Sequence, residues 1–210
     1  MWLRVSQVAF GLDQGVLGAT PNRMGVWTQG CSLPKCPGCV STHTWSADGG
    51  RPIPVASLLQ LARAQGVPPS GLTVSGGEPT DQAEAVAVLA AGFRAAFPEA
   101  ELVLYTGLRW RALMERFPDL AVRFDCVVAG PYVRTLEATA LAGSGNQEVR
   151  LLTPRAERLY AGWPSWPRHR VQVGQCQGEA LVTVGIPDTP RMTVAARQVG
   201  AVGVTWDQKQ

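Results

Sequence analysis

The fold of this chain is decided by one stretch, Leu72-Thr73-Val74-Ser75-Gly76-Gly77-Glu78-Pro79-Thr80. Its β-branched beginning predicts a short strand, which the two glycines end. Thr80 is predicted to cap the next helix. The apolar residues of that helix recur at helical spacing until Pro98, at Val86, Leu89, Phe93 and Phe97. The stretch therefore predicts a unit of strand, glycine turn and helix.

The same alternation continues on both sides of this unit. Further strands are predicted at Leu3–Phe10, Gly25–Gln29, Glu101–Thr106 and Phe124–Ala129. Further helices are predicted at Pro54–Gln65 and Leu108–Phe117. Strands that alternate with helices indicate βαβ units and a parallel sheet. Right-handed crossovers then bring the loops after the strands to one edge of the sheet, where ligands usually bind.

The alternation weakens beyond Arg150. Two strands of an antiparallel tail are predicted at His169–Val173 and Ala180–Gly185. We therefore expect a core domain over residues 1–153 and a C-terminal extension over residues 154–210 that packs on the core. The length of 210 residues fits this interpretation of one compact domain with an appendage.

Composition excludes several classes of protein. With 46% hydrophobic and 17% charged residues, the chain is globular and not intrinsically disordered. The net charge of +3 comes from scattered basic residues, so we expect no nucleic-acid partner. The longest apolar run, Ala85–Phe93, is far shorter than the roughly 20 residues that span a bilayer, so we expect no membrane partner. Residues 1–6 do not resemble a signal peptide, which predicts a cytoplasmic location.

Three of the five cysteines, Cys31, Cys36 and Cys39, form a C-x4-C-x2-C pattern on one predicted loop. Disulfides between such close neighbours would be strained, and a reducing cytosol disfavours them, so the pattern predicts metal binding. Structural zinc needs a fourth ligand, for which His43, Cys126 and Cys176 are the candidates. Three thiolates suit a 4Fe-4S cluster that leaves one iron open. The triplet alone leaves both metals possible.

The turn Ser75–Pro79 favours the cluster. Two glycines let the backbone approach a ligand closely, and Glu78 can bind an ammonium group through a charge-assisted hydrogen bond. Such a turn is common by itself. About forty residues after a cysteine triplet, it indicates an iron-sulfur protein with a small-molecule ligand.

In these motifs the sequence resembles the radical S-adenosylmethionine (SAM) superfamily, and within it the small activases of glycyl-radical enzymes, chiefly the anaerobic ribonucleotide-reductase activating proteins. The resemblance covers roughly residues 3–152. The matching stretches are Gln29-Gly30-Cys31, Cys36-Pro37-Gly38-Cys39, Thr44-Trp45, Ser75 to Pro79, Tyr105-Thr106-Gly107, Asp125 to Tyr132 and Gly143-Ser144-Gly145-Asn146-Gln147.

The resemblance implies an α/β fold, namely a partial (β/α) barrel of mainly parallel strands with helices outside, here with a small C-terminal β appendage. It implies that the three cysteines hold a 4Fe-4S cluster and that Gly76, Gly77 and Glu78 receive the methionine amino group of SAM. Thr106, Asn146 and Gln147 are expected as secondary cofactor contacts. No catalytic side chain is expected beyond the cluster and SAM.

The implied activity is reductive cleavage of SAM to a 5′-deoxyadenosyl radical, which activates a glycyl-radical enzyme such as an anaerobic ribonucleoside-triphosphate reductase. Flavodoxin or ferredoxin is the implied electron donor. The first cysteine spacing is one residue longer than the superfamily's usual three, and Val40-Ser41 replaces the usual aromatic residue and asparagine. A radical SAM enzyme that acts on a peptide or small metabolite is therefore an alternative. A non-catalytic, zinc-binding interaction module is another.

Overall fold

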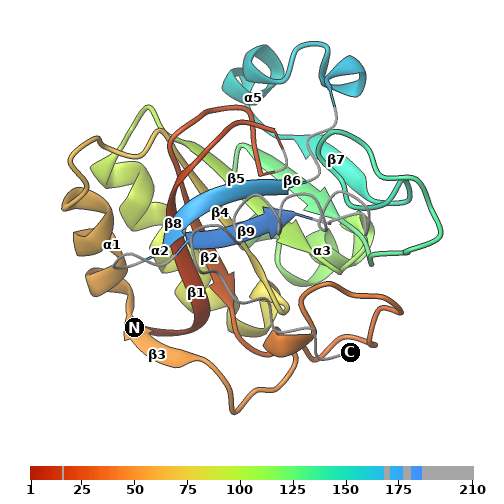
Figure 1. Cartoon of the computed structure of the whole chain (residues 1–210), viewed down its shortest axis with the longest axis horizontal. Coiled ribbons are helices and arrows are strands. Elements are labelled where there is room, and N and C mark those ends of the chain that lie inside the picture. The colour runs from red at the N-terminus through yellow and green to blue at the C-terminus, as the bar shows by residue number, and fades with distance from the viewer. Residues whose placement is uncertain (16, 168–170, 177–180, 186–210) are drawn as a thin grey trace, which may run out of the picture.

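A computed structural model describes residues 1–15, 17–167, 171–176 and 181–185, the last two ranges as backbone except for Val184 and Gly185 (Figure 1). The strands are β1 (Trp2–Leu12), β2 (Arg23–Thr28), β3 (Arg51–Pro54), β4 (Gly71–Gly76), β5 (Glu101–Thr106), β6 (Cys126–Ala129), β7 (Glu148–Leu151), β8 (Val171–Cys176) and β9 (Leu181–Gly185). The α-helices are α1 (Val55–Arg63), α2 (Ala83–Ala96), α3 (Trp110–Arg116), α4 (Pro118–Ala121) and α5 (Pro154–Leu159). Short 3-10 helices are η1 (Thr42–Thr44), η2 (Pro79–Gln82) and η3 (Trp163–Ser165).

In the described part of the chain, nine strands form one sheet in the order β7-β6-β5-β4-β2-β1-β8-β9, with β3 paired to β1. Strands β2, β4, β5 and β6 are parallel neighbours. Their carboxyl ends therefore meet at one edge of the sheet. The strand order starts and ends at different strands, so the sheet is an open, partial barrel.

Alternation along the strands gives the sheet two apolar faces. On β5, Leu102 and Leu104 belong to the largest hydrophobic cluster, whereas Val103 and Tyr105 belong to clusters on the opposite face. Helices α1 to α4 contribute their buried residues to the largest cluster, so these helices cover the outer face. This confirms the expectation of helices outside the sheet for α1 to α4, whereas the buried residue of α5, Ala156, belongs to a cluster on the opposite face.

The inner face is strongly curved. Val184 on the edge strand β9 belongs to the same hydrophobic cluster as Tyr105 on β5. These strands are five positions apart in the strand order, which would separate them by about 24 Å in a flat sheet. The sheet must therefore curl until β9 faces β5, and Figure 1 shows β8 and β9 crossing in front of the central strands.

The prediction of mainly parallel strands is confirmed only for the centre of the sheet. Three of the eight described strand pairings are parallel, and the other five are antiparallel. Parallel neighbours need a long crossover, usually a helix, but the connection from β1 to β2 contains none. Strands β3 and β7, each four residues long, were not predicted; β3 contains Pro52 and Pro54, and proline argues against a strand.

The C-terminal strands are antiparallel, as predicted, but they extend the main sheet by pairing β8 with β1. The predicted strand starts at His169 and Ala180 lie outside the described residues. Cys176, a candidate fourth ligand, is the last residue of β8. The boundary at residue 153 stays a prediction. No helix in the described ranges has the length and apolar character needed to cross a membrane.

Helix α2 begins differently from the prediction. Thr80 lies inside the 3-10 helix η2, and Glu78 caps η2, because its side chain accepts a hydrogen bond from the Thr80 N–H. Helix α2 itself begins after Gln82, which makes no side-chain capping hydrogen bond. The proline that follows Glu78 occupies the first position of η2, where a missing N–H costs nothing. The glycine turn and the start of η2 are thus joined through one carboxylate.

A buried ion pair fills the inner face at the amino ends of the parallel strands. Arg23 and Glu101 have fully buried side chains with 2.5 Å between Nη1 and Oε2. Arg23 Nε also donates to Thr73 Oγ1 at 3.0 Å, and Glu101 accepts from the Thr20 N–H at 2.9 Å and from the Tyr160 hydroxyl. The ion pair therefore links β2, β4, β5 and the segment after α5.

Replacement of Glu101 by Gln is expected to lower the free energy of unfolding by about 3–5 kcal/mol, because the Arg23 charge stays buried without a counter-ion. Denaturant unfolding measures the change. Glu115→Gln is the control: Glu115 pairs with Arg111 on the surface, where the side chains are 59% and 90% exposed. It should change stability by no more than about 0.5 kcal/mol. Equal losses in both variants would contradict the structural role given to Glu101.

Candidate cofactor site

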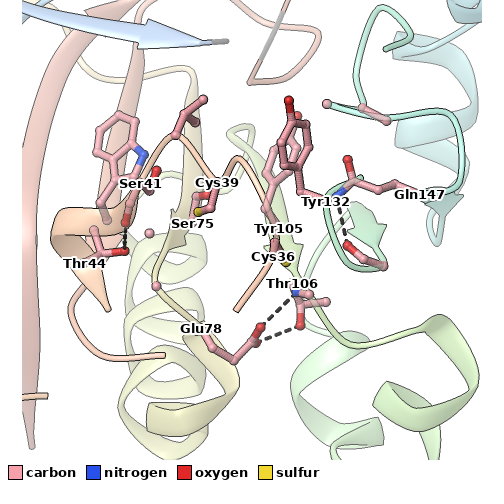
Figure 2. A pocket seen from close by; sticks show the side chains of 18 of the residues that line it. Cys36, Cys39, Ser41, Thr44, Ser75, Glu78, Tyr105, Thr106, Tyr132 and Gln147 are labelled. Carbon is pink, nitrogen blue, oxygen red and sulfur yellow. Dashed lines mark hydrogen bonds between the residues drawn. The ribbon is translucent and has the colours of Figure 1, made fainter. Parts of the chain in front are cut away.

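A cavity of about 240 Å³ opens at the carboxyl ends of β2, β4, β5 and β6 (Figure 2). It lies at the sheet edge where the sequence predicted a ligand. Its lining includes the predicted site residues Cys31, Cys36, Cys39, Gly76, Gly77, Glu78 and Thr106. The structure thus brings together all but one of the expected cofactor contacts.

The cysteine loop follows β2 directly. Cys31, Cys36 and Cys39 are half-buried free thiols on the cavity wall. The Cys31 N–H donates to the Trp45 carbonyl at 3.2 Å, and the Cys39 N–H donates to the Cys36 carbonyl at 3.1 Å. Burial raises the pKa of the Cys31 thiol, which is the state of the side chain without a metal. A metal-bound thiol loses its proton outright.

The longer spacer between Cys31 and Cys36 is held at both ends. Asp81 accepts from the Ser32 N–H at 2.7 Å and from the Ser32 hydroxyl at 2.5 Å. Lys35 Nζ donates to the Cys31 carbonyl at 2.6 Å and lies 5.2 Å from the centre of the Trp45 ring. The loop thereby accommodates the additional residue of this spacer by folding back on Cys31.

A backbone contact joins this loop to the glycine turn. The Glu78 N–H donates to the Gly30 carbonyl at 2.8 Å, and the Gly77 N–H donates to the Thr28 carbonyl at 2.9 Å. A Cβ on Gly77 would lie 1.9 Å from the Gly30 oxygen, so a side chain cannot fit there. Gly77 is therefore required for packing between two loops, whatever ligand they bind.

Gly76 meets a second constraint. Its φ of +117° is disfavoured for residues with a side chain, and a Cβ would lie 2.3 Å from the Thr28 nitrogen. The sequence predicted glycines here for close approach of a ligand. The structure shows that both glycines also allow β4 to pass close to the end of β2.

Glu78 is buried and already holds four hydrogen bonds from the chain. Its Oε1 accepts from the N–H and hydroxyl of Thr80 and from the Thr106 hydroxyl at 2.7 Å, and its Oε2 accepts from the Gly107 N–H at 2.8 Å. Figure 2 shows the carboxylate pointing at Thr106. Burial raises the pKa of Glu78, and the hydrogen bonds from Thr80, Thr106 and Gly107 oppose this shift.

The structure does not bring Asn146 to the cavity. Its exposed side chain donates to the Pro131 carbonyl at 2.8 Å and stabilises the loop. The adjacent Gln147 lines the cavity instead, beside Tyr132 in Figure 2. Tyr105 also lines it, and its hydroxyl donates to the Leu141 carbonyl at 2.8 Å. The sequence motifs contained Tyr105, Asn146 and Gln147. Only the geometry of the folded backbone decides which of these side chains faces the cavity.

The remaining fourth-ligand candidates are not in the cavity lining. Cys126 lies on β6, and burial raises the pKa of its thiol to about 12, so the side chain is an inert thiol. His43 is exposed in η1, and its carbonyl accepts a hydrogen bond from Gln29. These positions fit a structural role for both residues.

The donor set fits an iron-sulfur cluster. In the described residues, no three histidine, cysteine or carboxylate side chains converge as the ligands of one metal ion do. The cysteines of a 4Fe-4S site need not converge on one ion, because each binds a different iron atom. Three free thiols on one cavity wall supply the sulfur donors that such a cluster requires.

Comparison with known proteins finds a matching family model and similar proteins. The family model of the 4Fe-4S single cluster domain matches residues 17–150. The anaerobic ribonucleoside-triphosphate reductase-activating protein of Enterobacteria phage T4 is 29% identical over 131 residues, 60% of this chain and 82% of the phage protein. The protein of the same name from Escherichia coli K12 is 25% identical over 144 residues, 65% of this chain and 93% of that protein.

Among solved structures, QueE from Escherichia coli is similar with a TM-score of 0.44 and 14% identity, over 76% of this chain and 68% of QueE. The two activating proteins confirm the resemblance to the activase type, and the family model favours iron over zinc for the cysteine triplet. The matched residues contain both the cysteine loop and the Gly76–Glu78 turn. The chain therefore belongs to the 4Fe-4S single cluster domain family.

Proposed function

We propose that this chain is a radical SAM enzyme that uses a 4Fe-4S cluster to generate a glycyl radical on a protein partner. The observation that carries the proposal is that the three cysteine thiols and the Gly76–Glu78 turn line the same cavity. Two relatives are named as activating proteins of anaerobic ribonucleoside-triphosphate reductase, and a reductase of that kind is the proposed partner.

The three thiols would hold the cluster at the cavity wall, each on a different iron, so that one iron stays open to the amino and carboxylate groups of SAM. Reductive cleavage of SAM to methionine and a 5′-deoxyadenosyl radical is the chemistry that the bound cluster supplies. Asp81 and Lys35 fix the backbone on either side of the Cys31–Cys36 spacer and so position the first thiol.

The glycine turn would receive the methionine end of SAM. Gly76 and Gly77 expose backbone to the cavity, because no side chain covers them. Among the described contacts, Glu78 Oε2 accepts only the Gly107 N–H, so it retains room for an ammonium donor. Thr106 acts as a positioning residue, since its hydroxyl holds the other carboxylate oxygen.

The charge of the cavity bears on the substrate. In the described lining, Glu78 is the only charged side chain besides the thiols, and no lysine or arginine faces the space. A phosphate or carboxylate of an acidic metabolite would therefore find no lysine or arginine among the described lining residues. This supports the neutral main chain of a glycine segment over the alternative of an acidic small metabolite.

We propose flavodoxin or ferredoxin as the one-electron donor, since chemistry of this class consumes one electron for each cleavage. We also propose a cytoplasmic location, without a nucleic-acid or membrane partner.

Replacement of Cys36 by Ala is expected to abolish cluster binding and 5′-deoxyadenosine release, because a cluster ligand is lost. Iron analysis and chromatography of a dithionite-reduced reaction with SAM measure both quantities. Cys126→Ala is the control, since Cys126 is buried on β6 outside the cavity lining. It should keep about four irons per chain, the content of one 4Fe-4S cluster. Undiminished 5′-deoxyadenosine release by the Cys36 variant would refute the proposed function.

Replacement of Gly77 by Ala is expected to reduce 5′-deoxyadenosine release about 100-fold, because the clash with Gly30 moves the cysteine loop away from the turn. Gly66→Ala is the matched control, since a Cβ there meets nothing within 4 Å. Both variants are reconstituted and assayed in parallel, with circular dichroism as the check on folding. A folded Gly77 variant with the activity of the Gly66 variant would show that the contact does not position the cofactor.

A further inference from the structure

The cavity wall contains a segment from outside the family match. In the part of the chain that the structure describes, all but two lining residues lie between Leu17 and Gln147. The two exceptions are Val184 and Gly185, at the end of strand β9. The family match ends at residue 150, so the C-terminal hairpin adds a wall that the family pattern does not include.

The curvature of the sheet places Val184 and Gly185 at the carboxyl ends of the parallel strands, where the cavity lies. Trp27, Ser75 and Tyr105 are the last inward-facing residues of β2, β4 and β5 before the cysteine loop and glycine turns. Val184 packs in the same hydrophobic cluster as Trp27 and Tyr105, together with Leu17. The side chains of Leu17, Trp27, Tyr105 and Val184 form the apolar part of the cavity lining, which we call the apolar floor. The thiols and the glycine turn form the rest of the cavity wall.

Val184 is only 5% exposed, although it lies on the edge strand of the sheet. An edge strand normally leaves one side open to water. Here the side chain is covered by the opposite wall of the curled sheet, so the hairpin closes a space that would otherwise open sideways. Among the residues of β8 and β9, the structure describes the side chain of Val184 alone, and this side chain lines the cavity.

We propose that the β8–β9 hairpin completes the reaction cavity and that Val184 is a specificity-determining residue, which limits the depth of the apolar floor and excludes water from it. The inference rests on the proposed function, because it concerns the same cavity. The ligand part that contacts Val184 is an uncharged group, the ribose-linked base that SAM and S-adenosylhomocysteine share.

The first test uses Val184→Phe, whose larger side chain should fill the cavity next to the apolar floor. Binding of S-adenosylhomocysteine to the cluster-loaded protein, measured by calorimetry, should weaken at least tenfold. Val122→Phe is the matched control, since Val122 is 64% exposed on the surface and outside the cavity lining. It should bind the ligand as the unchanged protein does. A folded Val184→Phe protein with unchanged affinity overturns the inference.

The second test uses Val184→Ala, which should deepen the floor with little effect on folding. The number of glycyl radicals formed on the reductase per 5′-deoxyadenosine released, counted by electron paramagnetic resonance, should fall at least threefold. Val127→Ala is the control, because Val127 is also buried but belongs to the outer cluster. An unchanged ratio in the Val184 variant contradicts the inference.

The two proposals fail in different ways. If the unchanged protein neither binds S-adenosylhomocysteine nor releases 5′-deoxyadenosine, the proposed function is wrong. If the unchanged protein does both, and the Val184 variants match their controls, the function stands and the role of the hairpin is wrong.

Discussion

The close approach of Gly30 and Gly77 is the contact on which the site depends. The hydrogen bond from the Glu78 N–H to the Gly30 carbonyl joins the start of the cysteine loop to the turn after β4. Because a Cβ on Gly77 would lie 1.9 Å from that carbonyl oxygen, the two loops meet through bare backbone. The position of the thiols relative to the turn is therefore set by main-chain packing, which is more rigid than a contact between long side chains.

The same turn links the site to the rest of the sheet through Glu78. Its carboxylate accepts hydrogen bonds from Thr80 at the start of η2 and from Thr106 and Gly107 at the end of β5. A buried carboxylate is costly unless it is well hydrogen-bonded, so these donors and Glu78 stabilise one another. Glu78 fixes the ends of two parallel strands and offers its remaining acceptor capacity to the cavity.

The buried ion pair and the candidate cofactor site occupy opposite ends of the barrel. At the amino ends of the strands, the Arg23–Glu101 pair fills the interior and is satisfied by neighbouring groups such as Thr73 and Tyr160. At the carboxyl ends, the interior is apolar up to the rim, with Val184 among its walls. The ion pair closes one end of a curled sheet, and the other end stays free for a ligand.

The sequence by itself determined the elements and the chemistry of the site: the strand and glycine turn at 71–77, the three cysteines, and a parallel centre of the sheet. These features are local, since spacing, β-branching and thiol chemistry can be read over a few residues. Only the tertiary structure decided that Asn146 faces away while Gln147 faces inward, because the direction of a loop side chain depends on contacts far away in the chain. The tertiary structure likewise placed Val184 opposite Tyr105, since this requires the curvature of the sheet, which accumulates over many strand pairings and leaves no signal in any short segment.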